Sequence, residues 1–188
     1  MALLIIIQMV LGDEPGETVA AVFARLYEQY LPKVYRFIRF RIEDNDTAED
    51  LTSTVFEKAL TRFHAYQSQR ASFSTWVFVI ARNTVIDHFR VSHKDRMVEL
   101  DEDGPGHRDK GPSPEEQAIK EEEFGRLQAC LKRLPPAQQS VISLKFGAHM
   151  TNREIARSTG MSESQVGNMV FRAVRKLRDD FKGWRDED

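Results

Sequence analysis

Apolar residues recur every three or four positions along most of the chain, and this spacing predicts amphipathic helices. The helical pattern runs from about residue 19 to residue 93, breaks, and resumes from about residue 118 to residue 182. Alternating patterns typical of strands are few. The sequence therefore predicts an all-α protein with two small helical domains joined by an acidic, flexible linker.

Three helices are predicted in the N-terminal domain. The first, VAAVFARLYEQYLPKVYRFIRFRI, has a long apolar face that we expect Pro32 to interrupt. The second, NDTAEDLTSTVFEKALTRF, places Thr47 three residues before Asp50, which favours a capping box at its start. The third, FSTWVFVIARNTVIDHFR, is apolar on most faces in its first half, so we expect it to be the central helix.

One strip of the third helix differs from the rest. Trp76, Asn83, Asp87 and Arg90 follow steps of seven, four and three, which places them along one side of a helix. Asp87 and Arg90 have the spacing of a structural ion pair. The aromatic residues are expected mainly in the core. Asn83 is an uncharged amide among apolar neighbours, and it is therefore a candidate binding residue.

The stretch REIARSTGMSESQVGNMVFRAVRKLR joins two short amphipathic patterns at Gly160. Thr151 with Glu154, and Ser162 with Gln165, have the spacing of capping boxes at two helix starts. A glycine between them can adopt the left-handed conformation of a tight interhelical turn. The pattern predicts a helix-turn-helix, although capped helix pairs are also common in all-α proteins that bind no nucleic acid.

Charge is distributed unevenly over the 188 residues, whose formal net charge is −2. Residues 93–123 hold 5 Lys and Arg against 11 Asp and Glu, whereas residues 124–188 hold 12 against 7. The C-terminal domain is therefore basic and the linker acidic. The lone cysteine, Cys130, is expected to be a packed thiol in a reducing compartment, so we expect a cytoplasmic protein.

The apolar opening MALLIIIQMVLG lacks a basic n-region and an A-x-A cleavage site. It is also shorter than the roughly 20 residues that span a bilayer. We expect neither export nor membrane insertion. A start codon assigned too early and a short extra element packed on the first domain both remain open.

Two sets of strings resemble one family. DTAEDLTSTVFEKAL and FSTWVFVIARNTVIDHFR lie in the first domain, and LKRLPPAQQSVISLKF and NREIARSTGMSESQV lie in the second. Together they resemble the two-domain extracytoplasmic-function sigma factors of the sigma-70 family, the promoter-specificity subunits of bacterial RNA polymerase. The resemblance implies an N-terminal extension (1–18), a region 2 domain (19–93), a linker (94–117), a region 4 domain (118–182) and a tail (183–188).

The resemblance implies that the helix matching residues 47–60 binds the clamp helices of the polymerase's largest subunit. Its acidic outer face suits basic partner residues, although a merely solvated face has the same composition. The implied core-polymerase-binding residues are Glu49, Asp50, Ser53, Thr54 and Glu57. Many family members have a glutamine and an acid where this chain has Ser53 and Thr54.

The loop HAYQSQRAS and the helix after it resemble the element that recognises and melts the −10 promoter sequence. Trapping unstacked bases requires a pocket, stacking surfaces and cations for the backbone. The implied −10 residues are Tyr66, Gln67, Ser68, Arg70, Trp76, Arg82 and Asn83.

The helix-turn-helix would read the −35 element, with base contacts near the start of its second helix and phosphate contacts around them. The implied −35 residues are Arg153, Ser162, Ser164, Gln165, Asn168, Arg172, Arg175 and Lys176. Family members often have Lys, Ser and Arg where this chain has Gly167, Asn168 and Met169. A glycine inside a helix is unfavourable by about 1 kcal/mol relative to alanine.

The implied partners are promoter DNA and bacterial core RNA polymerase, through the clamp helices of the largest subunit and the flap of the second-largest subunit. An anti-sigma factor is also expected, and the acidic residues around Glu99–Asp103 would follow the RNA exit path. The five histidines are scattered and no catalytic motif appears, so we expect no enzyme activity, cofactor or metal. The alternative is a stand-alone helix-turn-helix regulator that binds operator DNA as a dimer.

Overall fold

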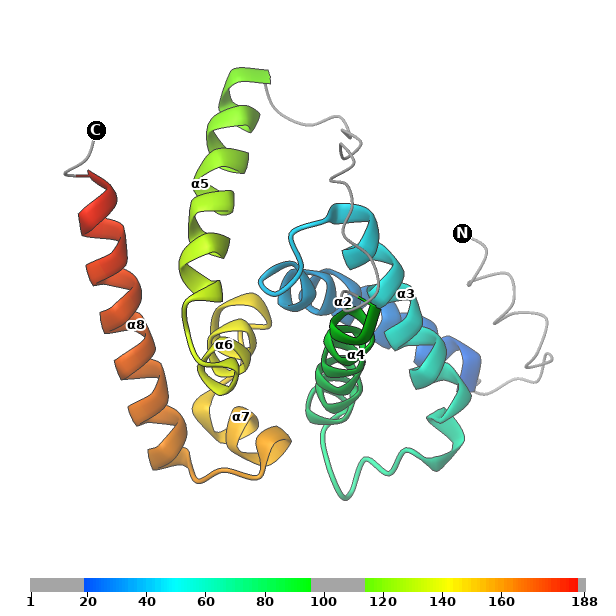
Figure 1. Cartoon of the computed structure of the whole chain (residues 1–188). Helices are drawn as coiled ribbons and strands as arrows, with labels where there is room; N and C mark the ends of the chain where they lie inside the picture. Colours follow the sequence, from blue (N-terminus) through cyan, green and yellow to red (C-terminus); the bar gives the residue numbers. More distant parts are fainter. Residues whose placement is uncertain (1–18, 96–113, 186–188) are drawn as a thin grey trace.

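The computed structural model describes residues 19–95 and 114–185 (Figure 1). The expected extension (1–18) and most of the expected linker, including its acidic run, lie outside these residues. The described part is helical and contains no strand. Its elements are α2 (Val19–Arg39), α3 (Asn45–Thr61), η1 (Phe63–Ala65), α4 (Phe73–Asp95), α5 (Pro114–Lys132), α6 (Pro136–Ile142), the π-helical turn η2 (Ser143–Gly147), α7 (Asn152–Thr159) and α8 (Glu163–Arg185).

Helix α2 is continuous, so the expected interruption at Pro32 is wrong. Pro32 is exposed, while Phe23, Val34 and Phe37 on the opposite side are fully buried. Proline removes one backbone donor from a helix. Burial of the apolar face on both sides of Pro32 offsets that loss, because packing contributes more to helix stability in proteins than propensity does.

Helix α3 begins earlier than the pattern predicts, and the capping box of Thr47 with Asp50 is wrong. Asp44 is the N-cap, and its carboxylate accepts a hydrogen bond from the Thr47 backbone N–H at 2.7 Å. Hydrogen bonds from the Thr47 hydroxyl and then its backbone N–H lower the pKa of Asp44. Aspartate is among the best N-cap residues, so it sets the start of the helix and Thr47 becomes its third residue.

Helix α4 is central to the N-terminal domain, as predicted. It contacts α2 and α3 of its own domain and α7 of the C-terminal domain. The core residues that it contributes are Phe73, Val77, Phe78, Ile80, Ala81 and Val85. Phe37 of α2 packs edge-to-face on Phe78 with ring centroids 5.7 Å apart. The expected core role of Phe73 and Phe78 is confirmed.

In the C-terminal domain, α5 begins at Pro114, four residues before the predicted start near residue 118. The predicted stop at Pro135 and Pro136 is confirmed, because α6 begins at Pro136. Cys130 is buried, and burial raises the pKa of its thiol. It is therefore the packed thiol that the sequence predicts.

The two domains pack against each other. α2 contacts η2, and α4 contacts α7. One hydrophobic cluster runs through both domains, from Phe37 and Phe78 to Leu144, Met150 and Ile155. The two domains therefore share a core, and a smaller second cluster of Leu131, Leu134, Ile142 and Ala173 lies within the C-terminal domain.

Candidate nucleic-acid and polymerase interfaces

The helix-turn-helix consists of α7 and α8, and both predicted capping boxes are present. The Thr151 N–H donates to the Glu154 carboxylate at 2.8 Å, and the Glu154 N–H donates to the Thr151 hydroxyl at 3.3 Å. The Ser162 N–H donates to the Gln165 side-chain oxygen at 2.8 Å, and the Gln165 N–H donates to the Ser162 hydroxyl at 3.2 Å. Gly160 has φ +76° in the turn between the helices, as expected.

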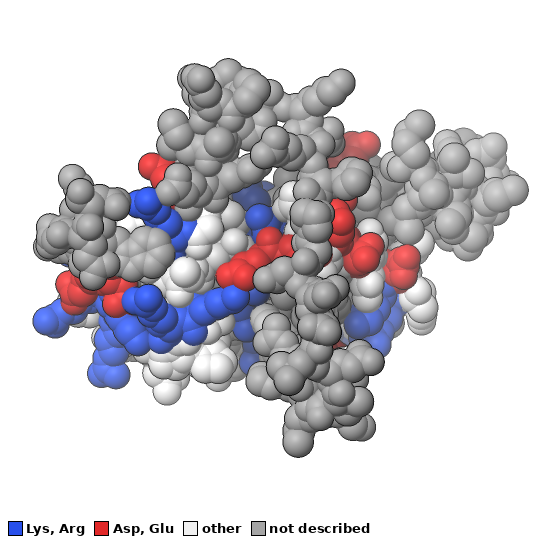
Figure 2. Space-filling model, turned by 45° about the horizontal axis from the view of Figure 1, so that its top comes forward, with Lys and Arg blue, Asp and Glu red and all other residues white. Residues whose placement is uncertain are grey.

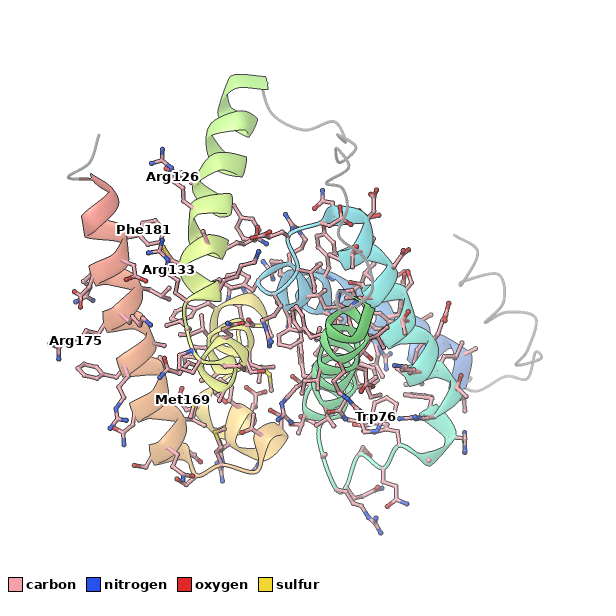
Figure 3. All side chains as sticks on the ribbon, in the orientation of Figure 1. Trp76, Arg126, Arg133, Met169, Arg175 and Phe181 are labelled. Atoms are coloured by element: carbon pink, nitrogen blue, oxygen red, sulfur yellow. The ribbon has the colours of Figure 1, made fainter. Side chains whose placement is uncertain are left out.

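Helix α8 is anchored by one face and exposed on the other. Val166 and Ala173 are fully buried on the inner face. Figure 3 shows Met169 directed into the helical bundle and Arg175 directed away from it. The exposed residues at the start and along the outer face of α8 are Ser162, Ser164, Gln165, Asn168, Arg172, Arg175 and Lys176. The structure therefore brings the predicted −35 residues of this helix onto one accessible face.

Two of the predicted phosphate-binding cations have partners within the protein. The Arg153 guanidinium lies 3.7 Å from the Glu163 carboxylate, and both side chains are largely exposed. Exposed pairs contribute little to stability, so a phosphate can replace the carboxylate at small cost. The Lys176 ammonium donates to the Arg133 carbonyl oxygen at 2.9 Å, just beyond the end of α5. Lys176 therefore also ties α8 to α5.

Gly167 has no packing role in the fold. A Cβ built there would meet only the Asn152 side-chain nitrogen, at an ordinary 3.6 Å. Its φ lies outside the positive range that favours glycine. Close packing and backbone conformation therefore both fail to explain glycine at this position of the recognition helix.

The residues predicted for the −10 element fall into an aromatic group and an exposed polar group. Tyr66 lies 5.1 Å from Trp76 and 5.7 Å from Phe73, centroid to centroid, and it stacks on Phe63 at 5.8 Å. The Tyr66 hydroxyl donates to the Ala71 carbonyl oxygen at 3.1 Å, which folds the loop onto α4. Burial raises the pKa of Tyr66, with a smaller contribution from Tyr30. Tyr66 and Trp76 are thus partly buried at the edge of the core.

The polar group lies partly in the loop before α4 and partly on α4 itself. Gln67, Ser68 and Arg70 are exposed in the loop, Asn83 is exposed on α4, and Arg82 is half-buried. The exposed Asp87 and Arg90 lie 3.8 Å apart, which confirms the predicted ion pair. Partly buried aromatic rings beside exposed amides and cations are suited to holding unstacked bases.

Helix α3 presents an acidic outer face. Glu49, Asp50, Ser53 and Glu57 are exposed and Thr54 is half-buried. The helical pattern predicts that Ala48, Leu51, Val55 and Ala59 are buried on the inner face. Ala48, Val55 and Ala59 are fully buried, and Leu51 is only partly buried. Figure 2 shows acidic side chains on the side of α3 and basic side chains gathered on the side of α5 and α8. The outer face of α3 is therefore acidic, whereas the exposed face of α8 is basic.

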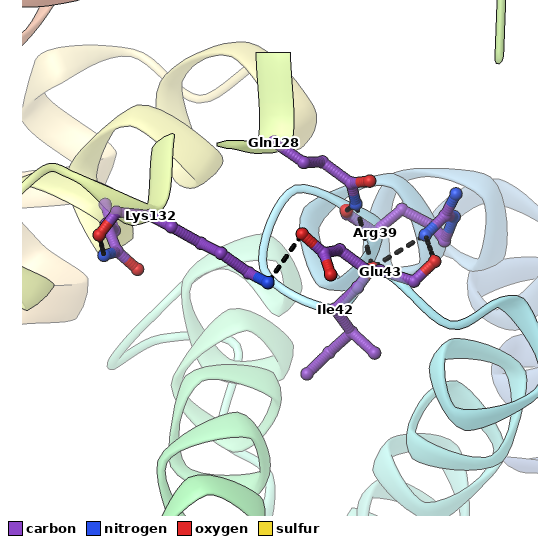
Figure 4. Close-up of polar contacts among 6 residues, drawn as sticks. Arg39, Ile42, Glu43, Gln128 and Lys132 are labelled. Carbon is purple, nitrogen blue, oxygen red and sulfur yellow. Dashed lines mark hydrogen bonds and ion pairs between the residues drawn. The ribbon is translucent and has the colours of Figure 1, made fainter. Parts of the chain in front are cut away.

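Polar contacts also join the two domains, and no pattern in the sequence predicts them (Figure 4). Gln128 of α5 donates from its side-chain nitrogen to the backbone oxygens of Arg39 and Ile42, at 2.6 and 3.0 Å. Lys132 of α5 lies 2.6 Å from the Glu43 carboxylate. These residues are in contact only because the domains pack together. Spacing along the sequence cannot predict a contact of this kind.

Among the described residues, none of the helices is both long enough and apolar enough to cross a bilayer. The same residues contain no group of three or more acidic, histidine or cysteine side chains able to hold a metal ion.

Comparison with known families identifies the class of the protein. Residues 26–94 match Sigma-70 region 2, and residues 124–177 match Sigma-70 region 4. The chain is 34% identical over 164 residues to the ECF RNA polymerase sigma factor RpoE of Cereibacter sphaeroides, covering 84% of this chain and 85% of that one. The protein therefore belongs to the ECF RNA polymerase sigma factors.

A second relative by sequence and a solved structure are also similar to the chain. The chain is 35% identical over 170 residues to the ECF RNA polymerase sigma factor BldN of Streptomyces coelicolor, covering 90% of this chain but only 63% of BldN. Among solved structures, RpoE in complex with the anti-sigma factor NepR from Bartonella quintana matches with a TM-score of 0.66 at 21% identity. That match covers 85% of this chain and 96% of the other, and it shows that the fold is shared.

Proposed function

We propose that this sigma factor divides promoter recognition between its domains. The N-terminal domain binds core polymerase through α3 and recognises and melts the −10 element through α4 and the loop before it. The C-terminal domain recognises the −35 element through α8. The observation that carries the proposal is the presence, in one chain, of an exposed acidic helix, an aromatic and amide surface, and a basic helix-turn-helix.

Polymerase binding is assigned to Glu49, Asp50, Ser53, Thr54 and Glu57 of α3. The acidic side chains are exposed on a helix that the core holds in place, so they require no rearrangement to meet basic partner residues. Complementary charge speeds encounter and fixes register more than it adds affinity. The contact should therefore weaken as salt rises.

Strand opening is assigned to the surface formed by Tyr66, Trp76 and Asn83, with Gln67, Ser68, Arg70 and Arg82 around it. An amide can donate to and accept from the edge of a base that has left the stack. Tyr66 and Trp76 lie 5.1 Å apart and offer ring surface next to exposed polar side chains. Arg70 and Arg82 supply positive charge for the strand's phosphates.

Upstream recognition is assigned to the exposed face at the start of α8. Ser164, Gln165 and Asn168 are positioned for base edges, and Ser162, Arg153, Arg172, Arg175 and Lys176 for the backbone. A groove of about 340 Å³ lined by Gln165, Asn168 and Arg172, among others, lies beside this face.

The chain acts without catalysis of its own, without a cofactor, and in the cytoplasm where the polymerase works. Binding of an anti-sigma factor is also proposed, because the solved structure of the sigma factor RpoE is a complex with the anti-sigma factor NepR. The flap of the second-largest polymerase subunit is the proposed partner of the C-terminal domain.

Run-off transcription with bacterial core polymerase over a promoter library tests whether the two domains recognise different promoter elements. Asn83→Ala should impair strand opening, measured by permanganate reactivity of unpaired thymines, while closed-complex formation continues. Arg172→Ala should weaken initial capture of the promoter and leave opening of the captured fraction intact. Arg90→Ala, which removes an exposed cation from α4, serves as the control. Equal effects of the three variants on both steps would contradict the assignment.

A further inference from the structure

Glu163 places a negative charge on the surface assigned to the −35 element. It is the first residue of α8, and its side chain is exposed next to Ser164. Duplex DNA carries one negative charge per about 1.7 Å of its axis. A carboxylate in this position therefore opposes the approach of any duplex, and none of the contacts assigned to the −35 element uses it.

The fold gives only a weak reason for an acidic residue here. A carboxylate in the first turn of a helix interacts favourably with the helix dipole, but the effect is small at an exposed position. The reciprocal hydrogen bonds of Ser162 and Gln165 already cap the start of α8. Val166 and Ala173 are fully buried and hold the helix in the fold. Helix α8 therefore does not depend on Glu163 for its start or its position.

Glu163 faces two cations of α7 across an open groove. The groove has a volume of about 450 Å³, and the residues that line it include Arg153, Arg157, Met161 and Glu163. Arg153 and Arg157 are exposed and four positions apart, so they lie on the same side of α7. The Arg153 Nε atom is 3.7 Å from the Glu163 carboxylate, and the two side chains are 69% and 59% exposed. One carboxylate thus partly neutralises a groove that two arginines make positive.

A backbone phosphate of DNA is suited to the same groove. Guanidinium groups bind phosphate through forked pairs of N–H donors, and Arg153 and Arg157 both line the groove. The Glu163 carboxylate pairs with Arg153 in the free protein, so a phosphate competes with it. An exposed ion pair is weak, and the phosphate can therefore displace the carboxylate. After that exchange the carboxylate has lost its partner and lies close to a like charge.

The base pairs next to α8 can supply a new partner for the carboxylate. The first turn of a recognition helix approaches base edges in the major groove. There cytosine and adenine present an amino group that donates to a carboxylate, whereas guanine and thymine present carbonyl oxygens that repel it. The cost of releasing Arg153 to a phosphate is therefore offset only when the base that faces Glu163 is cytosine or adenine. A group that repels the wrong sequence is one means by which a binding surface gains specificity.

We propose that Glu163 is a specificity-determining residue for the −35 element. In the free protein it pairs with Arg153. On DNA it releases Arg153 to a backbone phosphate, which Arg157 also contacts, and it accepts a hydrogen bond from the amino group of one cytosine or adenine. The base contact rests on the proposed function. The competition between Glu163 and a phosphate for Arg153 concerns duplex DNA of any sequence, and it can be measured without polymerase.

Titration of a random-sequence duplex with the full-length protein at low salt tests the competition. Glu163→Gln should bind about threefold more tightly, which matches the strength of an exposed ion pair. The slope of log K against log salt should steepen by about 0.9, because one further cation is free to neutralise a phosphate. Asp179→Asn is the matched control, since it also removes one carboxylate from the exposed side of α8, about 24 Å further along the helix.

Arg153→Ala, made in two backgrounds, separates competition from a general effect of charge. It should weaken duplex binding about twofold in the otherwise unaltered protein and about sixfold when combined with Glu163→Gln, because the two residues are coupled. Equal effects of Glu163→Gln and Asp179→Asn, or an equal effect of Arg153→Ala in the two backgrounds, would overturn the competition. Circular dichroism on each variant confirms that folded proteins are compared.

Selection from a promoter library randomised across the −35 element, with core polymerase, tests the base contact. The unaltered protein should enrich cytosine or adenine severalfold at one position of one strand. Glu163→Ala should lose this preference and keep those at the other positions, and Asp179→Asn should keep them all. Unchanged preferences with Glu163→Ala would overturn the specificity role. If the unaltered protein enriches no promoter with core, the proposed function and the base contact fail together, while the duplex titration still decides the competition for Arg153.

Discussion

The Arg41 guanidinium of the N-terminal domain donates a hydrogen bond at 3.1 Å to the Ser140 hydroxyl of the C-terminal domain, 99 positions further along the chain. The same cation lies over the Phe89 ring, 5.4 Å from its centroid. Its Nε atom is buried and has no hydrogen-bond partner. Burial, together with the nearby charge of Arg82, lowers the pKa of Arg41 to about 10. This contact between the domains therefore includes a poorly solvated positive charge.

Arg41→Met should stabilise the packed domains. The lowered pKa corresponds to a penalty of roughly 3 kcal/mol on the charged form. The hydrogen bond to Ser140 and the cation–π contact with Phe89 together stabilise the folded protein by roughly 2 kcal/mol. Methionine retains most of the apolar stem, so the net gain should be about 1 kcal/mol, a rise in melting temperature of about 3 °C. Thermal unfolding at pH 7 measures it, with Arg90→Met as an exposed control. A lower melting temperature would show that the hydrogen bond and the ring contact outweigh desolvation.

Asp44→Ala should destabilise the protein by about 1 kcal/mol at pH 7, because it removes the N-cap of α3. The hydrogen bonds from Thr47 hold the pKa of Asp44 below its ordinary 3.8. Their contribution is therefore present above pH 3.8 and is lost as the pH falls through the lower pKa of the folded state. Urea unfolding at pH 7 and pH 3 should give a smaller difference between the two proteins at pH 3. Asp44→Asn keeps a capping oxygen and should show little of this pH dependence. A difference that does not shrink in acid would argue against the carboxylate as the cap.

Gly167→Ala should make the fold more stable and −35 recognition weaker. Alanine is favoured over glycine inside a helix by about 1 kcal/mol, and its Cβ would have ordinary contact with Asn152 at 3.6 Å. The glycine then serves the approach of DNA to α8. Thermal unfolding and transcription from a −35-dependent promoter measure the two effects on the same protein. Unchanged promoter strength with a more stable fold would remove Gly167 from the interface.

Glu49→Lys with Glu57→Lys should weaken the binding of core polymerase and reduce its salt dependence, because the change reverses charge on the exposed face of α3. Titration of labelled protein with core at two salt concentrations measures both effects. Glu28→Lys on the exposed side of α2 is the matched control for each single reversal, Glu49→Lys or Glu57→Lys, since it makes the same change in net charge outside the candidate surface. If all charge reversals weaken binding equally, the contact is not localised to α3.

Short-range features of the fold are predictable from the sequence and long-range ones are not. The caps of α7 and α8 and the left-handed Gly160 depend on residues within three or four positions, so spacing alone predicts them. The capping box predicted at Thr47 is wrong because Asp44, three residues earlier, also suits the N-cap position. Aspartate is the better N-cap residue of the two, so it caps α3. The interruption expected at Pro32 is wrong because local helix propensity does not include the core packing that keeps α2 continuous.

The candidate binding surfaces can also be predicted from the sequence only where they depend on local spacing. The outer faces of α3 and α8 follow from helical periodicity, and their exposure agrees with it. The partial burial of Tyr66 and Trp76 depends on how the loop folds back on α4, which periodicity does not describe. The contacts of Gly147 with α2 and of Gln128 with the end of α2 join residues roughly 90 to 110 positions apart, and only the tertiary structure brings such residues together.

Promoter binding measured with and without core polymerase tests the central claim most directly. Fluorescence anisotropy of a promoter duplex containing both elements should show little binding by the protein alone at micromolar concentration. Adding core should give tight binding and an opened −10 region on the same DNA. Tight, sequence-specific binding by a dimer without core, unchanged when core is added, would contradict the account and favour a stand-alone operator-binding regulator.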